Sequence, residues 1–285
     1  MAPPGTSSGS TKTAPASYLA RQVSTWRKQY ARADAQLGLA ATSPRVADHA
    51  DALAEAIATA AAAVDERRFG PPTSSSRDAA ADPGCSEPAG GFLCVAHGDL
   101  RCDNCVFDAT EARVVALLDW ELATLGHPVS DLAYLAMPHA VPPLPFGPLS
   151  GFEGLDATRH GLPVVEDLVE AYLDEVARRG RPRHAEVVLA ALPHLDLFTA
   201  VAYFRAAGIV RGVYARAKTG NASAANALAV GSLATTLLRV SEDCARAHRE
   251  GGSDTTRRVV ARADGMEQAG GLGTPSATSS SSSSS

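Results

Sequence analysis

The feature of the sequence that most constrains the fold is a polar motif followed closely by an acidic one. The first, His97–Asn104, has the sequence HGDLRCDN, and the second, Leu117–Glu121, has the sequence LLDWE. Phosphoryl transfer needs one carboxylate to orient and deprotonate the attacking hydroxyl, and two oxygen ligands for Mg²⁺ on the nucleotide phosphates. Asp99, Asn104 and Asp119 have the residue types and the order that this chemistry requires.

Apolar runs beside the two motifs predict the strands that hold them. Phe92–Ala96 is typical of a buried strand that leads into the first motif, and Val114–Leu118 is typical of a strand that delivers Asp119. We therefore expect a small catalytic β-hairpin over residues 92–120.

Taken together, these motifs resemble the kinase-like fold of the aminoglycoside phosphotransferase family, in particular the branch that is fused to acyl-CoA dehydrogenases in eukaryotes. The resemblance is carried by four segments, namely Tyr18–Tyr30, His97–Asn104, Leu118–Tyr134 and Phe204–Tyr214. It extends over about residues 17 to 247 and is strongest at the catalytic loop. It implies an α+β protein, the mostly helical C-terminal lobe of a protein-kinase-like fold with a small catalytic β-hairpin.

The resemblance gives roles to Asp99 and Arg101. Asp99 would be the catalytic base, whereas an Asp that only caps a turn is the alternative interpretation of this residue taken alone. Arg101 would lie against the transferring phosphoryl group and offset its charge. A solvated Arg101, or one paired with Asp103, fits the sequence nearly as well.

The same resemblance implies a metal and nucleotide site. Asn104 and Asp119 would bind the Mg²⁺ that accompanies ATP, because carboxylate and carboxamide oxygens suit this hard cation. A lone Asn would more often form a turn, but the spacing of the pair favours the metal site. Glu121 would add a metal carboxylate, with entry into a helix as an equal alternative.

Three further residues receive supporting roles. His97 is expected to be structural, and Asp131 is expected to brace the catalytic loop by accepting backbone N–H bonds. Arg205 would pair with Asp131 or Glu121, or else bind an anionic substrate. Phe204 and Tyr214, its aromatic neighbours on the same helix, are expected to be core residues.

The sequence before Tyr18 predicts no nucleotide-binding lobe. Met1–Ala16 contains Lys12 as its one charged residue and offers neither a Gly-rich phosphate loop nor a strand Lys, so we expect disorder there. On this interpretation, ATP binding by the chain alone is weak or absent. Three hypotheses follow: a kinase of a small-molecule hydroxyl such as a hydroxyacyl derivative, a pseudokinase that binds a protein partner at the exposed lobe interface, or a fragment of a longer kinase-like acyl-CoA dehydrogenase.

Patterning divides the chain into a kinase-like domain over residues 17–249 and two flanking disordered segments, 1–16 and 250–285, the second rich in serine. A Pro-, Ser- and Gly-rich stretch at residues 70–91 predicts a flexible insertion. Helical periodicity predicts helices over residues 17–37, 44–67, 130–137, 163–179, 183–218 and 222–248.

Composition narrows the function classes. A net charge of −5 argues against nucleic-acid binding, and we find no apolar run of the ~18 to 20 residues that span a membrane. Cys102 and Cys105 have the spacing of a redox pair or half a zinc site, but no second such pair is present to complete a zinc site. The compartment stays open, with the cytoplasm as the default and a peroxisome or mitochondrion as alternatives.

Overall fold

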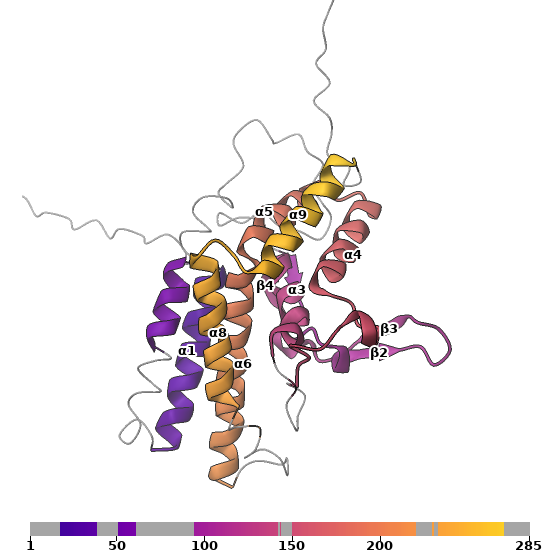
Figure 1. The fold of residues 1–285 in the computed structure, drawn as a ribbon. Helices are drawn as coiled ribbons and strands as arrows, with labels where there is room; N and C mark the ends of the chain where they lie inside the picture. The colour runs from indigo at the N-terminus through magenta and orange to yellow at the C-terminus, as the bar shows by residue number, and fades with distance from the viewer. Residues whose placement is uncertain are drawn as a thin grey trace, which may run out of the picture.

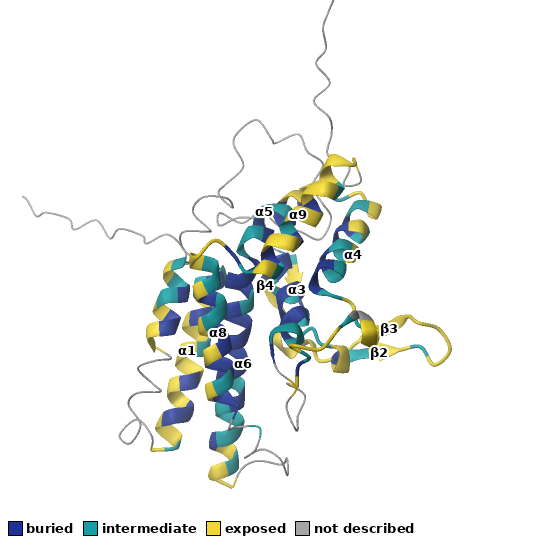
Figure 2. Cartoon of the chain, in the orientation of Figure 1, coloured by how far each residue is buried: buried dark blue, intermediate teal, exposed yellow. Residues whose placement is uncertain are grey.

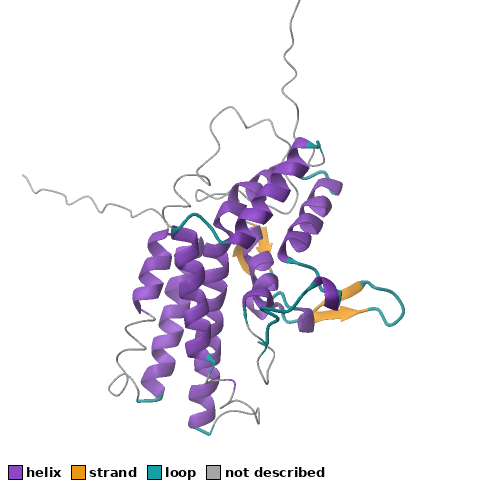
Figure 3. Cartoon of the chain, viewed as in Figure 1, coloured by secondary structure: helices purple, strands orange, loops and turns teal. Residues whose placement is uncertain are grey.

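The computed structural model describes residues 18–38, 51–60, 94–141, 143, 150–220, 230 and 233–270. This part of the chain is mostly helical and contains two small antiparallel sheets (Figure 1; Figure 3). The predicted combination of many helices with few strands is therefore confirmed. The expected disorder of residues 1–16 and the expected insertion at 70–91 lie outside the described residues.

Three long helices pack side by side on one side of the molecule (Figure 1). They are α1 (Tyr18–Gln36), α6 (Leu195–Lys218) and α8 (Ala234–Arg249). Helix α6 contacts both of the others and is buried around most of its circumference, as Figure 2 shows. A helix that is apolar on nearly all sides is stable only inside a core, so α6 is the axis of the fold. Residues 51–60 are also helical, within the predicted 44–67 helix.

The helical run Pro182–Lys218 is 37 residues long and contains an 18-residue window that is strongly apolar. By length and composition it is, among the described residues, the one helical run that could cross a membrane, which the sequence analysis did not anticipate. However, 72% of its most apolar window is buried inside the protein, as is usual for a core helix. The run is thus weak evidence for a membrane.

A second group of helices packs beside this bundle (Figure 1). It comprises α3 (Pro128–Ala136), α4 (Val165–Arg178), α5 (Pro182–Ala191) and α9 (Asp254–Gln268). The single helix predicted over residues 183–218 is in fact α5 and α6 separated by a 3₁₀ turn at Leu192–His194. Pro193 lies in this turn, and a proline has no backbone N–H to continue the α-helical ladder.

Helix α9 corrects the prediction that the chain is disordered from residue 250 onward. Ser253 begins the helix, because its side-chain oxygen accepts a 3.1 Å bond from the backbone N–H of Thr256. The carboxylate of Asp196 in turn accepts from the backbone N–H of Ser253 at 2.7 Å and from its hydroxyl at 2.8 Å. The cap therefore ties the start of α9 to α6.

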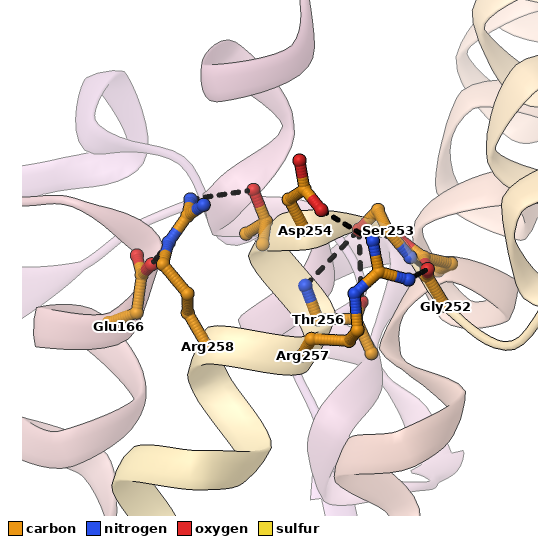
Figure 4. A network of polar contacts seen from close by, with 9 residues as sticks. Glu166, Gly252, Ser253, Asp254, Thr256, Arg257 and Arg258 are labelled. Carbon is orange, nitrogen blue, oxygen red and sulfur yellow. Dashed lines mark hydrogen bonds and ion pairs between the residues drawn. The ribbon is translucent and has the colours of Figure 1, made fainter.

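Ion pairs join α9 to α4 along its length. Arg258 binds the carboxylate of Glu166, and Arg262 binds Asp167 at 2.9 Å (Figure 4 shows the first pair). Val259 is buried against the core on the inner face of the helix. The polar composition of this segment suggests disorder, but its few apolar residues recur at helical spacing and pack into the core. Residues 271–285 lie outside the described chain.

The strands form two separate two-stranded sheets, which corrects the prediction of one hairpin over residues 92–120. β1 (Cys94–Ala96) pairs antiparallel with β4 (Thr124–Gly126), and β2 (Cys105–Phe107) pairs with β3 (Val114–Leu117). The expected strand before Asp119 is confirmed. The first strand is not fully buried as predicted, since Val95 is 61% exposed.

The buried imidazole of His127 makes the stability of this fold depend on pH. Its Nδ1 atom accepts from the backbone N–H of Val129 at the start of α3, and burial lowers its pKa to about 3. In the unfolded chain this histidine has its ordinary pKa of about 6.5, so between pH 6.5 and 3 it binds more protons than in the folded protein. The contribution of neutral His127 to the free energy of unfolding is therefore fully present above pH 6.5 and is lost as the pH falls toward 3.

We expect the free energy of unfolding to fall by up to about 1.4 kcal/mol per pH unit over this window because of His127. Replacing His127 with Asn keeps an N-cap acceptor and should flatten the profile, whereas the exposed His160→Gln should not. Urea unfolding between pH 4 and 7 measures both profiles; an equally steep slope in His127→Asn would contradict the assignment.

Candidate active site

The predicted catalytic loop, His97–Asn104, is anchored by the carboxylate of Asp131 from α3. One oxygen accepts from the backbone N–H of His97 at 2.6 Å, and the other accepts from the backbone N–H of Gly98 at 2.9 Å. The prediction that Asp131 braces the loop is confirmed. Gly98 has a φ of +78°, and a Cβ atom there would lie 2.5 Å from the carbonyl oxygen of Leu122, so the close approach requires glycine.

His97 joins the two motifs through its ring. Nδ1 accepts from the backbone N–H of Asp99 at 3.2 Å, which leaves Nε2 to donate to the carbonyl oxygen of Leu118 at 2.9 Å. The ring also contacts that of Trp120, with 4.5 Å between centroids. Both nitrogens are thus engaged in structure, in agreement with the supporting role expected for His97.

Asp99 is held by polar neighbours at the end of the loop. One of its carboxylate oxygens accepts from Asn104 Nδ2 at 3.0 Å. Burial and the carboxylate of Asp99 together raise the pKa of the neighbouring Tyr134 phenol. Asn104 Nδ2 also donates to the backbone carbonyl of Asp99 at 2.8 Å. Arg101 Nε lies 3.5 Å from Asp99, while its Nη2 lies 3.1 Å from Asp103. The pairing of Arg101 with Asp103, one of the alternatives from the sequence, therefore exists beside the contact with Asp99.

Asp119 has an unusual backbone conformation. Its φ of +64° is the one positive value among the non-glycine residues that the structure describes. Such a conformation carries strain for an L-residue and occurs preferentially at functional sites. The backbone N–H of Leu118 donates to the carbonyl of Asn104 at 2.8 Å, and this bond holds the Asp119 segment next to Asn104. The structure thus brings the two predicted metal ligands to neighbouring segments.

The side chains that would bind a divalent cation have oxygen atoms that no described protein group occupies. Nδ2 of Asn104 faces Asp99, so Oδ1 is the atom left for a metal. The carboxylates of Asp119 and Glu121 make no hydrogen bond or ion pair with any described residue, and both side chains are exposed. No cluster of three or more His, Cys, Asp or Glu residues occurs in the described chain. Two carboxylates and an amide oxygen nevertheless fit Mg²⁺, which takes few protein ligands and retains several waters.

Two clefts open beside the catalytic loop and share Arg101 and Tyr134. The first, here named the Asp99 cleft, has a volume of about 590 Å³ and lies between α1, α6 and the loop, with Trp26, Asp99 and Val213 among its lining residues. The second has a volume of about 450 Å³ and is lined mainly by apolar side chains, including those of Met137, Phe152 and Leu237. A small molecule in either cleft would lie next to the catalytic loop.

The environment of Arg205 differs from the one expected. Arg205 forms no ion pair with Asp131 or Glu121; instead its guanidinium lies over the rings of Trp26 and Tyr134. Phe204 is buried as predicted. The sequence analysis assigned no role to Tyr134 or Trp26, although Tyr134 follows Asp131 by three residues and so shares its helix face.

The cysteines of the catalytic loop are free thiols in this structure. Cys102 and Cys105 flank Asn104 in the 3₁₀ turn Cys102–Asn104 and the following strand. The thiol of Cys105 donates to the carbonyl oxygen of Arg101 at 3.4 Å, and burial raises its pKa. A raised pKa reduces the fraction of reactive thiolate at Cys105.

Comparisons with known proteins agree with this geometry. Residues 7–187 match the phosphotransferase enzyme family (APH). A crystal structure of a putative aminoglycoside phosphotransferase from Ralstonia eutropha JMP134 is similar, with a TM-score of 0.54 and 25% sequence identity. The similarity covers 82% of this chain and 57% of the bacterial chain.

Among curated proteins, the chain is similar to acyl-CoA dehydrogenase family members 10 and 11. It is 41% identical to member 11 from chicken (Gallus gallus) over 132 residues, and 37% identical to member 10 from mouse (Mus musculus) over 149 residues. These matches cover 45% and 52% of this chain but only 15% and 13% of the two relatives. The chain therefore spans a small part of the length of these relatives.

Proposed function

Because the chain belongs to the phosphotransferase enzyme family, we propose that its site transfers the γ-phosphoryl group of ATP to the hydroxyl of a small molecule, with Asp99 as the base. The observation that carries this proposal is the joint geometry of the two motifs. One carboxylate, Asp99, lines a cleft and is held by Asn104, and the oxygen ligands Asn104 and Asp119 lie on adjoining segments.

In the proposed reaction the acceptor lies in the Asp99 cleft with its hydroxyl directed at the Asp99 carboxylate. The hydroxyl oxygen forms a bond to the γ-phosphorus, the bond from that phosphorus to the bridging oxygen of ADP breaks, and the hydroxyl proton passes to Asp99. Arg101, already 3.5 Å from Asp99, offsets negative charge on the transferring group. Positioning by these side chains supplies most of the rate enhancement in such reactions.

Asn104, Asp119 and Glu121 would hold Mg²⁺, which when bound neutralises charge on the nucleotide phosphates. Asn104 has a second task that does not depend on the metal. Its Nδ2 atom donates to both the carboxylate and the backbone carbonyl of Asp99, so it fixes the base relative to the loop. A single side chain therefore links the orientation of the base to the position of the metal ligand.

For the acceptor we propose a hydroxylated acyl derivative. The names of the curated relatives refer to acyl-CoA dehydrogenases, which act on acyl groups. The clefts beside the loop support such an acceptor, because Trp26, Val210 and Val213 form an apolar wall in the first and Met137 and Phe152 contribute to the second. An acyl chain is apolar and would gain free energy by leaving water against these walls.

A second candidate function is suggested by apolar side chains on the two small sheets, whose strands are largely exposed (Figure 2). Val95 and Leu125 on one sheet, and Phe107 and Val114 on the other, are all largely exposed. Surfaces that gather such residues mark interaction sites in many proteins. In this alternative the chain is a non-catalytic module whose surface binds a polypeptide equivalent to the part of the Ralstonia phosphotransferase that this chain does not match.

Incubation of the chain with Mg-ATP and a series of hydroxyacyl acids and their thioesters separates the two candidates. Because weak ATP binding is expected of the chain alone, Mg-ATP is supplied at millimolar concentration. We then expect a Mg²⁺-dependent phosphomonoester signal in ³¹P NMR, together with formation of ADP, for at least one acceptor. Formation of ADP without a phosphorylated product would reject the acyl acceptor class but retain the ATP reaction. Neither product, at enzyme concentrations comparable with substrate, would reject catalysis by this chain and favour the binding module.

A further inference from the structure

Arg205 is a buried charge whose location needs an explanation. It lies in the middle of the apolar helix α6 and is only 9% exposed. Its Nε and Nη2 atoms are inaccessible and have no hydrogen-bond partner among the described residues. Removing a guanidinium from water without a carboxylate partner is strongly unfavourable, so such a residue is rarely placed in a core without a compensating role.

Two aromatic rings supply the contacts that Arg205 makes. Its guanidinium carbon lies 5.2 Å from the ring centroid of Trp26 on α1 and 5.0 Å from that of Tyr134 on α3. A desolvated guanidinium over an aromatic face is attracted by the negative charge density of the ring. The stack therefore fixes the plane of the Tyr134 ring relative to two other helices.

Tyr134 and the base, Asp99, line the same cleft. Burial and the nearby carboxylate of Asp99 raise the pKa of the Tyr134 phenol above its usual value. The phenol stays protonated and can only donate to an ionised carboxylate. Asp99 receives one donor from Asn104, at 3.0 Å, and a second donor from Tyr134 would define the orientation of the carboxylate better than one does.

We propose that Tyr134 is a positioning residue for Asp99, and that Arg205, by stacking on the Tyr134 ring, holds it in place. This inference rests on the proposed function, in which Asp99 receives the proton of the acceptor hydroxyl. Tyr134 and Arg101 are the two residues shared by both clefts, so the side chain that orients the base also contributes to the wall beside the acceptor. The orientation of Asp99 then depends on Arg205 in α6 as well as on the residues of its own loop.

The test compares two tyrosines that each lose one hydroxyl. Tyr134→Phe keeps the ring for Arg205 to stack on, so we expect its kcat to fall about tenfold while the KM for ATP stays within about twofold of wild type. Tyr203→Phe is the matched control, because the Tyr203 hydroxyl donates to the carbonyl of Met137 inside the core. It should lower the melting temperature and leave kcat unchanged.

Arg205→Lys retains the charge but loses the planar group that stacks. We expect its kcat to fall as in Tyr134→Phe, and combining the two changes should add little, because both act through one ring. Unchanged kcat in Tyr134→Phe, with a wild-type chain that transfers phosphate, would overturn the positioning role and leave the proposed function standing. Absence of transfer by the wild type would overturn the proposed function, and this inference with it.

A double-mutant cycle in urea unfolding tests the contact without relying on turnover. The cycle uses Asp99→Ala, Tyr134→Phe and the double variant. We expect the unfolding equilibrium constants to be non-additive by about tenfold or more, as for a hydrogen bond to a charged group. Strict additivity would show that the two side chains do not interact and would reject the inference on its own.

Discussion

Replacement of Asp99 by Asn is expected to lower the rate of phosphoryl transfer by about 10²- to 10⁴-fold, the usual contribution of a positioned general base. Asn has the same size and its carbonyl oxygen can still accept a hydrogen bond, but it cannot take a proton from the acceptor hydroxyl. The side-chain amide of Asn104, which donates to Asp99, therefore keeps a partner. The melting temperature should stay within a few degrees of wild type.

The control for this prediction is Asp103→Asn in the same loop. Asp103 is exposed and pairs with Arg101 at 3.1 Å, so its replacement removes the same charge without touching the base. A surface pair of this kind contributes little to stability. We expect Asp103→Asn to retain most of the activity. Equal losses in the two variants would mean that loop charge, rather than the carboxylate of Asp99, sets the rate.

Local sequence patterns were sufficient to predict how the His97–Asn104 loop is held. The backbone N–H groups of His97 and Gly98 must find an acceptor, and the acidic residue at the start of the next helix, Asp131, provides both oxygens. This arrangement depends on short segments whose types and order are visible in the sequence. The same holds for α1, whose apolar residues recur with a helical period.

Nonlocal pairing could not be predicted in the same way. Strand β1 pairs with β4, which lies beyond the second motif, rather than with β3. Three- and four-residue strands carry almost no register information, because a shift exchanges which side chains face the core and short apolar runs tolerate several partners. The contacts of Arg205 also join segments that are far apart in the sequence. Helical periodicity places Arg205 on a face of α6, but only packing decides that Trp26 and Tyr134 meet there.

Helix α9 illustrates a different limit of sequence patterns. Its composition is polar, and only a narrow stripe that includes Thr256, Val259 and Ala263 is buried. Isolated helices of this length are marginal in water, so tertiary contacts must stabilise it. Those contacts are ion pairs with α4 and the cap at Ser253, which reaches back to Asp196 on α6. None of these partners is close in sequence, and the helix could not be recognised from composition alone.

Asp119 links backbone strain to the proposed metal site. In Asp119→Gly the positive φ of +64° becomes unstrained, while the flexible unfolded chain gains entropy; the two effects nearly cancel. We therefore expect the free energy of unfolding to change by no more than about 1 kcal/mol, on the stabilising side if at all. Mg²⁺-dependent phosphoryl transfer should nevertheless be lost, because the carboxylate that would bind the cation is gone.

Asp119→Asn and Asp119→Ala complete this prediction because they separate the loss of the metal-binding oxygen from the change in backbone strain. Asn tolerates the left-handed conformation and keeps one oxygen, so we expect it to weaken Mg²⁺ binding and leave stability unchanged. Ala lacks the oxygen and fits this conformation poorly, so it should lose both metal binding and about 1 kcal/mol of stability. Titration with Mn²⁺ followed by electron paramagnetic resonance measures the binding, and urea unfolding measures the stability. If Asp119→Gly bound the cation as wild type does, the carboxylate of Asp119 would not be a ligand, and its strained backbone would need another explanation.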